Sequence, residues 1–179
     1  MKVTAGFSLV ELIVVITIVS ILMAVGVPSY RYVTNSNRMS AEVNGLLGDL
    51  QFARAEAIKE GATVTVCPPV SPSNLTACSG TSITWDQGWI VLSATANPAV
   101  LRVQQPFATT KDSFVSTNNE TSISFDRNGF ASAQPALTNA GVMIKLTTTP
   151  NAKQWTRCVE IAWGGMLTTV RNQQDPNCQ

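Results

Sequence analysis

The sequence predicts an α+β protein in which a long N-terminal helix packs on antiparallel β-sheet structure. Two observations predict this fold class. An uninterrupted apolar run from Phe7 to Val27 is followed, up to about residue 60, by apolar residues at three- and four-residue spacings. Beyond residue 61, short alternating segments are separated by turn residues. At 179 residues, the chain fits one modest domain plus an attachment segment.

The apolar run has the length of a membrane span. As a helix, its 21 residues reach about 32 Å, which is enough to cross a bilayer core. No small-x-small cleavage site closes the run, so we expect it to stay in the mature protein. Pro28 marks a break or kink at its end. We therefore expect a transmembrane helix over residues 7–28, its amphipathic continuation over 29–60 and a β-rich globular domain over 61–179.

Glu11 is the one carboxylate inside this run. An acid at the centre of a membrane helix costs about 2.5–3.5 kcal/mol, so an intramembrane acid calls for a partner. The nearest basic residues in the sequence are Lys2 and Arg31, and neither lies within the run. The alternative is an acid near the interface that reaches water by snorkelling.

The amphipathic continuation and the strands follow from periodicity. One apolar stripe is expected to be core, with Gly61 as the helix C-cap. The stripe comprises Val43, Leu46, Leu47, Leu50, Ala53, Ala57 and Ile58. Strands are expected within residues 63–67, 82–92 (around Trp89–Leu92), 99–107, 141–149, 155–165 and 166–171, with a hairpin at 122–132 that turns at Asn128–Gly129.

Two Ser/Thr/Asn-rich stretches, residues 71–80 and 108–121, are expected to be loops. Asp112 and Glu120 lie in the second stretch and are interpreted as solvated. Trp89 lies in an apolar strand and is expected in the core. Trp155 and Trp163 are interpreted as core residues, with an interface as the alternative.

Composition argues against most catalytic chemistry. The chain has no histidine, which removes histidine-based triads and most catalytic zinc sites. No phosphate-binding loop, nucleotide fingerprint or metal-ligand cluster is present, so we expect no enzyme activity, no cofactor and no metal. The formal net charge of +1 gives no overall footprint for nucleic-acid binding.

The four cysteines, at positions 67, 78, 158 and 178, allow three pairings. They fall into two separated couples, and neither has the C-x-x-C spacing of a zinc or redox motif. In an oxidising compartment this pattern predicts two local disulfides, Cys67–Cys78 and Cys158–Cys178. The alternative is four buried free thiols, which would suit a cytosolic protein.

The N-terminal stretch AGFSLVELIVVITIVSILMAVGVPSY resembles the start of type IV prepilins and type II secretion pseudopilins. In that superfamily a short leader ends in glycine, phenylalanine usually follows, and a glutamate stands fifth in the mature chain. Gly6, Phe7 and Glu11 match these positions. The resemblance implies a leader over residues 1–6, cleavage after Gly6 by prepilin peptidase, methylation of the new amino terminus at Phe7, and pairing of Glu11 with the Phe7 ammonium of a neighbouring subunit.

Later blocks resemble the GspH/FimT-type branch, namely LLGDLQFARAEAIKEGATVTVCP, WDQGWIVL, ISFDRNGF and RCVEI. Some members of that branch bind DNA through a C-terminal Gly-Arg-x-Arg motif. Here the matching stretch, GGMLTTVR, has Met166 and Thr168 where the arginines would stand. Lys153, Arg157 and Arg171 remain as candidate DNA contacts.

The resemblance implies a pilin-like fold and a structural role. The favoured interpretation is a minor pilin of a type IV pilus, which co-assembles with other pilins to prime or cap the filament and supports twitching motility. The alternatives are a type II secretion pseudopilin and a DNA-binding pilin for natural transformation. The implied location is the bacterial inner membrane, with one span and a periplasmic C-terminal domain, followed by the pilus or pseudopilus. The implied partners are other minor and major pilins, prepilin peptidase and the inner membrane; no small-molecule substrate is implied.

Overall fold

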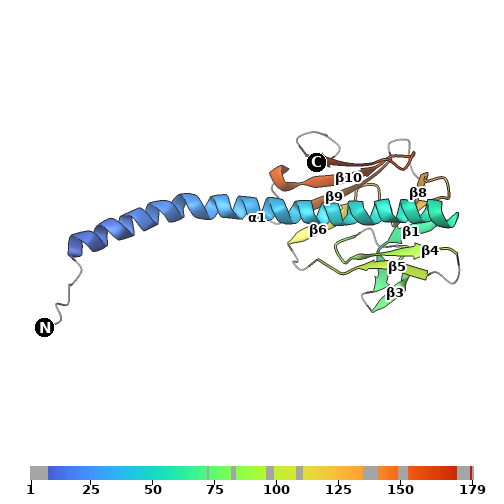
Figure 1. Cartoon of the computed structure of the whole chain (residues 1–179), viewed down its shortest axis with the longest axis horizontal. Helices are drawn as coiled ribbons and strands as arrows, with labels where there is room; N and C mark the ends of the chain where they lie inside the picture. Colours follow the sequence, from blue (N-terminus) through green and yellow to red (C-terminus); the bar gives the residue numbers. More distant parts are fainter. Residues whose placement is uncertain are drawn as a thin grey trace. The chain divides into compact units, whose positions relative to one another are not determined.

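The computed structural model describes residues 8–71, 73–81, 84–95, 99–107, 111–134, 141–148, 153–172 and 178 (Figure 1). The chain divides into two compact units, Met1–Arg38 and Met39–Gln179. The first described residues of unit one begin the helix α1, Leu9–Glu60, which continues into unit two. The second unit holds all of the described β-strands and the hydrophobic core.

The core-facing stripe of α1 begins at Met39. Its buried residues recur every three or four positions, as a helix with one buried face requires. They are Met39, Val43, Leu46, Leu50, Ala53 and Ala57. The predicted stripe is therefore confirmed at five positions, while Leu47 is only partly buried. Ile58 was expected in the core and is instead 52% exposed, because its place on the helix turns it toward the flank rather than toward the stripe.

The end of α1 is closed as the sequence predicts. Gly61 has φ 66°, and the N–H of Ala62 donates to the carbonyl of Ala57 over 3.3 Å. This is the bond of a Schellman-type C-terminus, in which glycine takes the left-handed conformation at low cost.

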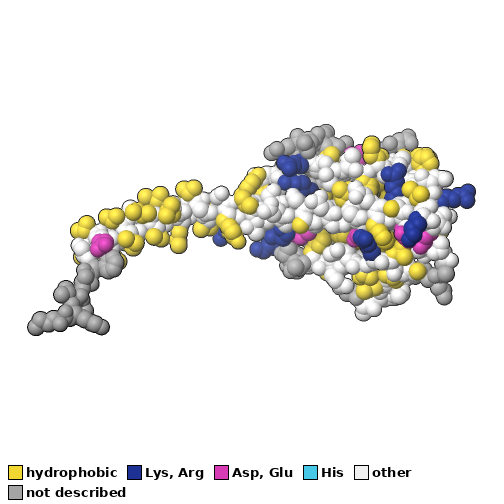
Figure 2. All heavy atoms as spheres, viewed as in Figure 1, with side chains coloured by type: hydrophobic (Ala, Val, Ile, Leu, Met, Phe, Trp, Pro, Cys, Tyr) yellow, Lys and Arg dark blue, Asp and Glu magenta, His cyan; other side chains and the backbone are white. Residues whose placement is uncertain are grey.

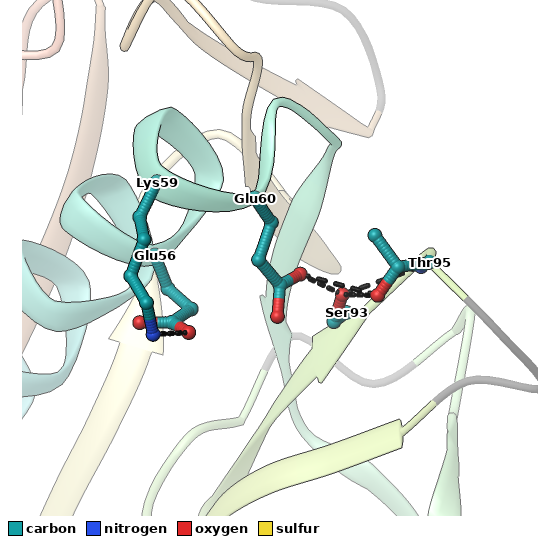
Figure 3. Close-up of polar contacts among 5 residues, drawn as sticks. All are labelled: Glu56, Lys59, Glu60, Ser93 and Thr95. Atoms are coloured by element: carbon teal, nitrogen blue, oxygen red, sulfur yellow. Dashed lines mark hydrogen bonds and ion pairs between the residues drawn. The ribbon is translucent and has the colours of Figure 1, made fainter.

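Two side chains of the last turn fix the helix end (Figure 3). The carboxylate of Glu60 accepts hydrogen bonds from the hydroxyls of Ser93 and Thr95, the latter over 3.2 Å, which ties α1 to the end of β4. Lys59 donates to Glu56 over 2.7 Å, and this hydrogen bond raises the pKa of Lys59 above its ordinary value. The cation also complements the negative end of the helix dipole.

Three antiparallel sheets follow. The first has the strand order β5-β4-β1-β7-β8, the second β11-β10-β9-β6, and β2 pairs only with β3. The strand bounds are β1 Val64–Cys67, β2 Pro69–Ser71, β3 Asn74–Cys78, β4 Trp89–Ser93, β5 Ala99–Gln104, β6 Asp112–Ser116, β7 Ser122–Phe125, β8 Ala131–Gln134, β9 Val142–Thr148, β10 Arg157–Ile161 and β11 Leu167–Arg171, with a 3-10 turn η1 at Lys153–Trp155. In Figure 1 the C-terminal part of α1 crosses both large sheets, with β9 and β10 on one side and β1, β4 and β5 on the other.

The core forms where the helix stripe meets both sheets. Its largest fully buried side chains are aromatic: Trp85, Trp89, Phe114 and Phe125. Trp89 meets Phe114 edge-on at 6.3 Å between ring centroids, an arrangement that aromatic quadrupoles favour. The core position predicted for Trp89 is confirmed, and Trp155 is partly buried against the same cluster. Trp163 was also expected in the core, but it is 68% exposed because it lies in the turn between β10 and β11.

A strand lies at each predicted strand segment and the Asn128–Gly129 hairpin turn is present, but the two predicted loops are wrong. β3 lies within residues 71–80. β6 lies within residues 108–121, and Asp112, Phe114 and Ser116 form its buried face. Asp112 and Glu120, interpreted as solvated, are only 2% and 3% exposed. The hydroxyl of Ser116 donates to the Glu120 carboxylate and accepts from the Glu120 N–H over 3.0 Å, so the buried acid has hydrogen-bonding partners.

Both predicted disulfides are present, Cys67–Cys78 and Cys158–Cys178. Each joins residues close in sequence, 11 and 20 positions apart. Closing loops of this size stabilises the fold by about 2–4 kcal/mol each in the chain-entropy description.

We expect the protein purified without reductant to contain no free thiol. Alkylation of the denatured, unreduced protein should leave its intact mass unchanged, whereas alkylation after reduction should add four groups, one for each cysteine. Labelling without reductant would contradict the oxidised state.

A polar network ties α1 to β4 and β5. The indole N–H of Trp89, which is buried, donates to Asp49 Oδ2 over 2.9 Å. The other oxygen of Asp49 lies 3.0 Å from Arg102 Nη1. The Arg102 guanidinium also stacks on Phe52, 3.8 Å from the ring centroid. One carboxylate on the helix therefore contacts two strands of the first sheet.

We expect Asp49→Ala to lower the free energy of unfolding by about 1–3 kcal/mol, because it leaves the buried Trp89 N–H without an acceptor. Arg102→Ala should cost less, since exposed ion pairs contribute about 0–1 kcal/mol. Asp49→Asn keeps an acceptor for the indole and should lie between them. Urea denaturation of the full-length protein in detergent, followed by tryptophan fluorescence, measures the order. Equal costs for Asp49→Ala and Arg102→Ala would contradict it.

Candidate functional site

The first unit presents an apolar helical surface. Large hydrophobic side chains are exposed along the described part of this unit from Leu9 to Val33 (Figure 2). In length and composition, α1 qualifies as a helix able to cross a membrane, and it lies near the N-terminus. Contiguous exposed apolar surface of this extent marks a membrane or protein contact rather than a face in water.

Two hydroxyl groups on this surface are satisfied within the helix. Thr17 Oγ1 donates to the carbonyl of Ile13 over 2.7 Å, and Ser20 Oγ donates to the carbonyl of Thr17 over 2.8 Å. In hydrocarbon such internal bonding is required, because no water is available to the hydroxyls. The helix is therefore compatible with an apolar environment at these two positions.

Glu11 is exposed and lies in the first turn of α1. A carboxylate is favoured there, because the free N–H groups at a helix N-terminus carry partial positive charge. Among the described residues the nearest base along the helix is Arg31, twenty positions away, which corresponds to about 30 Å. Gly6 and Phe7, the predicted cleavage and methylation positions, lie outside the described residues.

Pro28 lies inside α1 rather than at its end. The helix continues through it to Glu60, so of the expected break or kink the structure excludes the break. Proline removes one backbone hydrogen bond without ending a helix whose other residues favour it. A bend at Pro28 stays a prediction.

The three candidate DNA contacts, Lys153, Arg157 and Arg171, differ in how the structure places them. Arg157 and Arg171 stand directly opposite each other on β10 and β11. Arg157 is only 7% exposed, and its Nη1 donates to the carbonyls of Gln154 and Thr156 over 3.2 and 3.1 Å. Lys153 begins η1, and its side chain lies outside the description. The pair is therefore not an open row of cations of the kind that phosphates require.

The sequence interpretation missed a cluster at the hairpin turns. Arg54 of α1 donates from Nε to the carbonyl of Gly129 over 3.0 Å and from Nη2 to that of Gly164 over 3.2 Å. It thus bridges the β7–β8 turn and the β10–β11 turn. The rings of Phe130 and Trp163 lie 6.5 Å apart on these turns, and both side chains are exposed. The only signal for this contact in the sequence is the glycines in the two turns, because glycine allows another chain segment to approach its backbone closely.

The comparisons with known proteins agree on the family. The family model of the type II transport protein GspH matches residues 42–165, and that of the prokaryotic N-terminal methylation motif matches residues 1–27. No curated protein matches the chain.

Two crystal structures of the type IV minor pilin FimU of Pseudomonas aeruginosa strain PAO1 share the fold. In one, with a TM-score of 0.56 and 16% identity, the match covers 80% of this chain and 92% of FimU. In the other, with a TM-score of 0.51 and 15% identity, it covers 82% and 98%. The likeness supports the predicted α+β, type IV pilin-like fold. Because the GspH model matches more than half of the sequence, the chain belongs to the GspH family of pilin-like proteins, with an N-terminal methylation motif ahead of its globular domain.

Proposed function

We propose that this pilin-like structural subunit is a minor pilin of a type IV pilus, which co-assembles with other pilins to prime or cap the filament and supports twitching motility. The observation that carries the proposal is the exposed apolar helix with a single acid in its first turn. A helix of this kind can be stored in a bilayer and later packed against the helices of neighbouring subunits.

The proposed chemistry of assembly uses three residues. Prepilin peptidase cuts after Gly6, and Phe7 then carries the methylated amino terminus. The Glu11 carboxylate pairs with the Phe7 ammonium of the next subunit inside the helix bundle. A buried charge is costly when alone and tolerable when paired. This contact would therefore stabilise the one packing register of neighbouring helices in which the two charges meet. Before assembly the chain spans the inner membrane once, with its globular domain in the periplasm.

The second candidate function is a pseudopilin of type II secretion. The description of the matching family model favours it. The same fold and the same pairing chemistry serve both filaments, and the partners then are other pseudopilins. The two disulfides favour the pilus, since the secretion-type members that the sequence resembles often lack them.

Deleting the gene distinguishes the two filaments. We expect the deletion strain to lose twitching motility while it secretes exoproteins at the normal level, and a plasmid copy should restore twitching. The matched control is a strain without the prepilin peptidase, which should lose every filament that depends on it. Loss of secretion with normal twitching would assign the chain to the pseudopilus instead.

The third interpretation, a DNA-binding pilin, has less support. It needs several arginines that can reach phosphates together, whereas the Arg157 guanidinium is largely buried and bonded to backbone carbonyls. The formal net charge of +1 adds no general attraction for DNA.

A further inference from the structure

A hollow of about 280 Å³ lies beside the β7–β8 and β10–β11 turns, with an acid and two aromatic rings in its wall. It is lined by Asp126, Phe130, Ala131, Ser132 and Trp163. The side chain of Phe130 is 50% exposed and that of Trp163 is 68% exposed. Large aromatic side chains that stay in water side by side mark a contact surface rather than a core.

Hydrogen bonds hold the three principal side chains of this hollow in place. Asp126 Oδ1 accepts from the N–H of Asn128 over 2.8 Å and from the N–H of Phe130 over 2.9 Å. The N–H of Ala131 donates to the carbonyl of Trp163 over 3.1 Å, which joins the second turn to the first. The carboxylate and both rings are therefore positioned before any ligand arrives, and such preorganisation lowers the cost of binding.

The carboxylate of Asp126 is open to a cation. Both of its hydrogen bonds end on Oδ1, and Oδ2 makes no hydrogen bond or ion pair with a described residue. The nearby cations Arg54 and Arg127 do not line the hollow. The Arg54 guanidinium donates instead to the carbonyls of Gly129 and Gly164 and lines a different hollow. A free carboxylate oxygen between exposed rings complements a positively charged ligand.

The chemistry of the wall favours a guanidinium among the organic cations. The faces of aromatic rings attract cations, and arginine stacks on them more often than lysine does. A guanidinium is planar and weakly hydrated, whereas the ammonium of lysine is strongly hydrated and loses more on entering a largely apolar hollow. A quaternary ammonium has no N–H group to donate to Asp126 Oδ2, so it would leave that oxygen without a partner.

We propose that this hollow binds an arginine side chain of a neighbouring subunit. The guanidinium would lie against the rings of Phe130 and Trp163 and donate to Asp126 Oδ2. Tryptophan and arginine are the residues that most often dominate the energy of a protein contact. The identity of the neighbour as a filament subunit rests on the proposed function, whereas the cation-binding chemistry of the hollow does not.

The test uses the full-length protein in the uncharged detergent dodecyl maltoside, labelled with 5-fluorotryptophan. The chain has four tryptophans, and Trp163→Phe identifies the fluorine resonance of Trp163 by removing it. The probe is N-acetylarginine methylamide, and the measured quantity is the chemical shift of that resonance during titration. We expect a saturable shift, from which a dissociation constant follows. The neutral citrulline analogue keeps the shape but not the charge, so it should give no saturable shift.

Two variants and one control test the parts of the hollow. Asp126→Asn keeps an oxygen for the N–H groups of the turn and removes the charge. It should weaken binding of the probe about threefold or more, since charge-assisted hydrogen bonds are roughly twice as strong as neutral ones. Phe130→Leu keeps apolar bulk without a ring face and should weaken binding about twofold or more. Glu160→Gln, which removes one acid from a β10 residue outside the hollow, should leave binding unchanged.

Several outcomes of these titrations would overturn the inference. No shift of the Trp163 resonance, an equal shift with the citrulline analogue, or wild-type binding by Asp126→Asn would each do so. If the lysine analogue binds as tightly as the arginine probe, the choice of arginine is wrong. If tetramethylammonium binds more tightly than the arginine probe, the ligand is a choline-type cation instead.

A second measurement tests the source of the arginine. Phe130 is replaced by the photoreactive p-benzoylphenylalanine, and sheared filaments are irradiated. We expect the cross-linked peptides of a neighbouring subunit to carry an arginine within about three residues of the link, because three residues of extended chain span roughly 10 Å. Links only to segments without arginine would refute a neighbouring subunit as the source. Absence of the chain from filaments would refute the proposed function and this source together, while the titrations of the isolated protein judge the cation site alone.

Discussion

A chain with Glu11→Val is expected to insert into the membrane at least as well as the wild type and to fail in filament assembly. Valine removes the insertion cost of the acid, which is about 2.5–3.5 kcal/mol for an acid near the centre of a span. In the proposed assembly it also leaves the ammonium of a neighbouring subunit buried without a partner. Breaking a buried pair in this way costs about 3–5 kcal/mol, or roughly a hundredfold or more in an association constant.

The measurement compares the chain in sheared filaments with the chain in the membrane fraction by quantitative immunoblotting. Leu12→Val is the control, since it changes an adjacent exposed apolar residue and keeps the acid. It should assemble normally. If Glu11→Val reaches wild-type levels in filaments, the pairing argument is refuted. The prediction about membrane insertion is tested separately, by the level of the variant in the membrane fraction.

The second large effect is expected at the β10–β11 turn. Gly165 has φ 72°, and a Cβ at this position would lie 2.1 Å from the carbonyl oxygen of Gly129. Alanine would add about 1–2 kcal/mol of left-handed backbone strain and would force the two hairpin turns apart. The hydrogen bonds that Arg54 makes to both turns would be lost with that separation. We expect Gly165→Ala to destabilise the protein by about 3 kcal/mol or more.

The neighbouring glycine provides the control. A Cβ on Gly164 would meet nothing within 4 Å, and its φ lies outside the left-handed region. Gly164→Ala should therefore stay within about 0.5 kcal/mol of wild type. Urea denaturation of the full-length proteins in detergent, followed by tryptophan fluorescence, measures both. If the two alanines cost the same, the close approach of the turns does not contribute to stability.

The periodicity of the sequence predicted the features that depend on residues close together in the chain. The helix stripe, most strands and the Asn128–Gly129 turn follow from spacings within a few residues, and the cysteine couples are local as well. Trp163 and β6 show where this approach ends. In the sequence alone, a tryptophan in a tight turn resembles a core residue. Asp112 and Ser116 lie in a polar stretch, and only the pairing of β6 with β9 shows that they belong to a sheet.

The residues of the candidate site also fall into two groups, those that the sequence alone indicates and those that only the folded structure reveals. Glu11 stands out because one acid interrupts an apolar run, which is visible in any sequence. The bridge made by Arg54 joins residues 75 and 110 positions apart, which no local pattern reports. The opposition of Arg157 and Arg171 likewise required the register of β10 and β11.

The placement of the disulfides has a mechanical consequence. Cys67–Cys78 joins the end of β1 to β3, and Cys158–Cys178 joins β10 to the C-terminal end of the chain. Neither bridges the two large sheets, and neither reaches α1. Tension transmitted through the helix would therefore pass into the sheets through the buried stripe and the polar anchors at Asp49, Arg54 and Glu60. Under a pulling force, neither disulfide would resist separation of the helix from the sheets, so the seam along the helix would yield first.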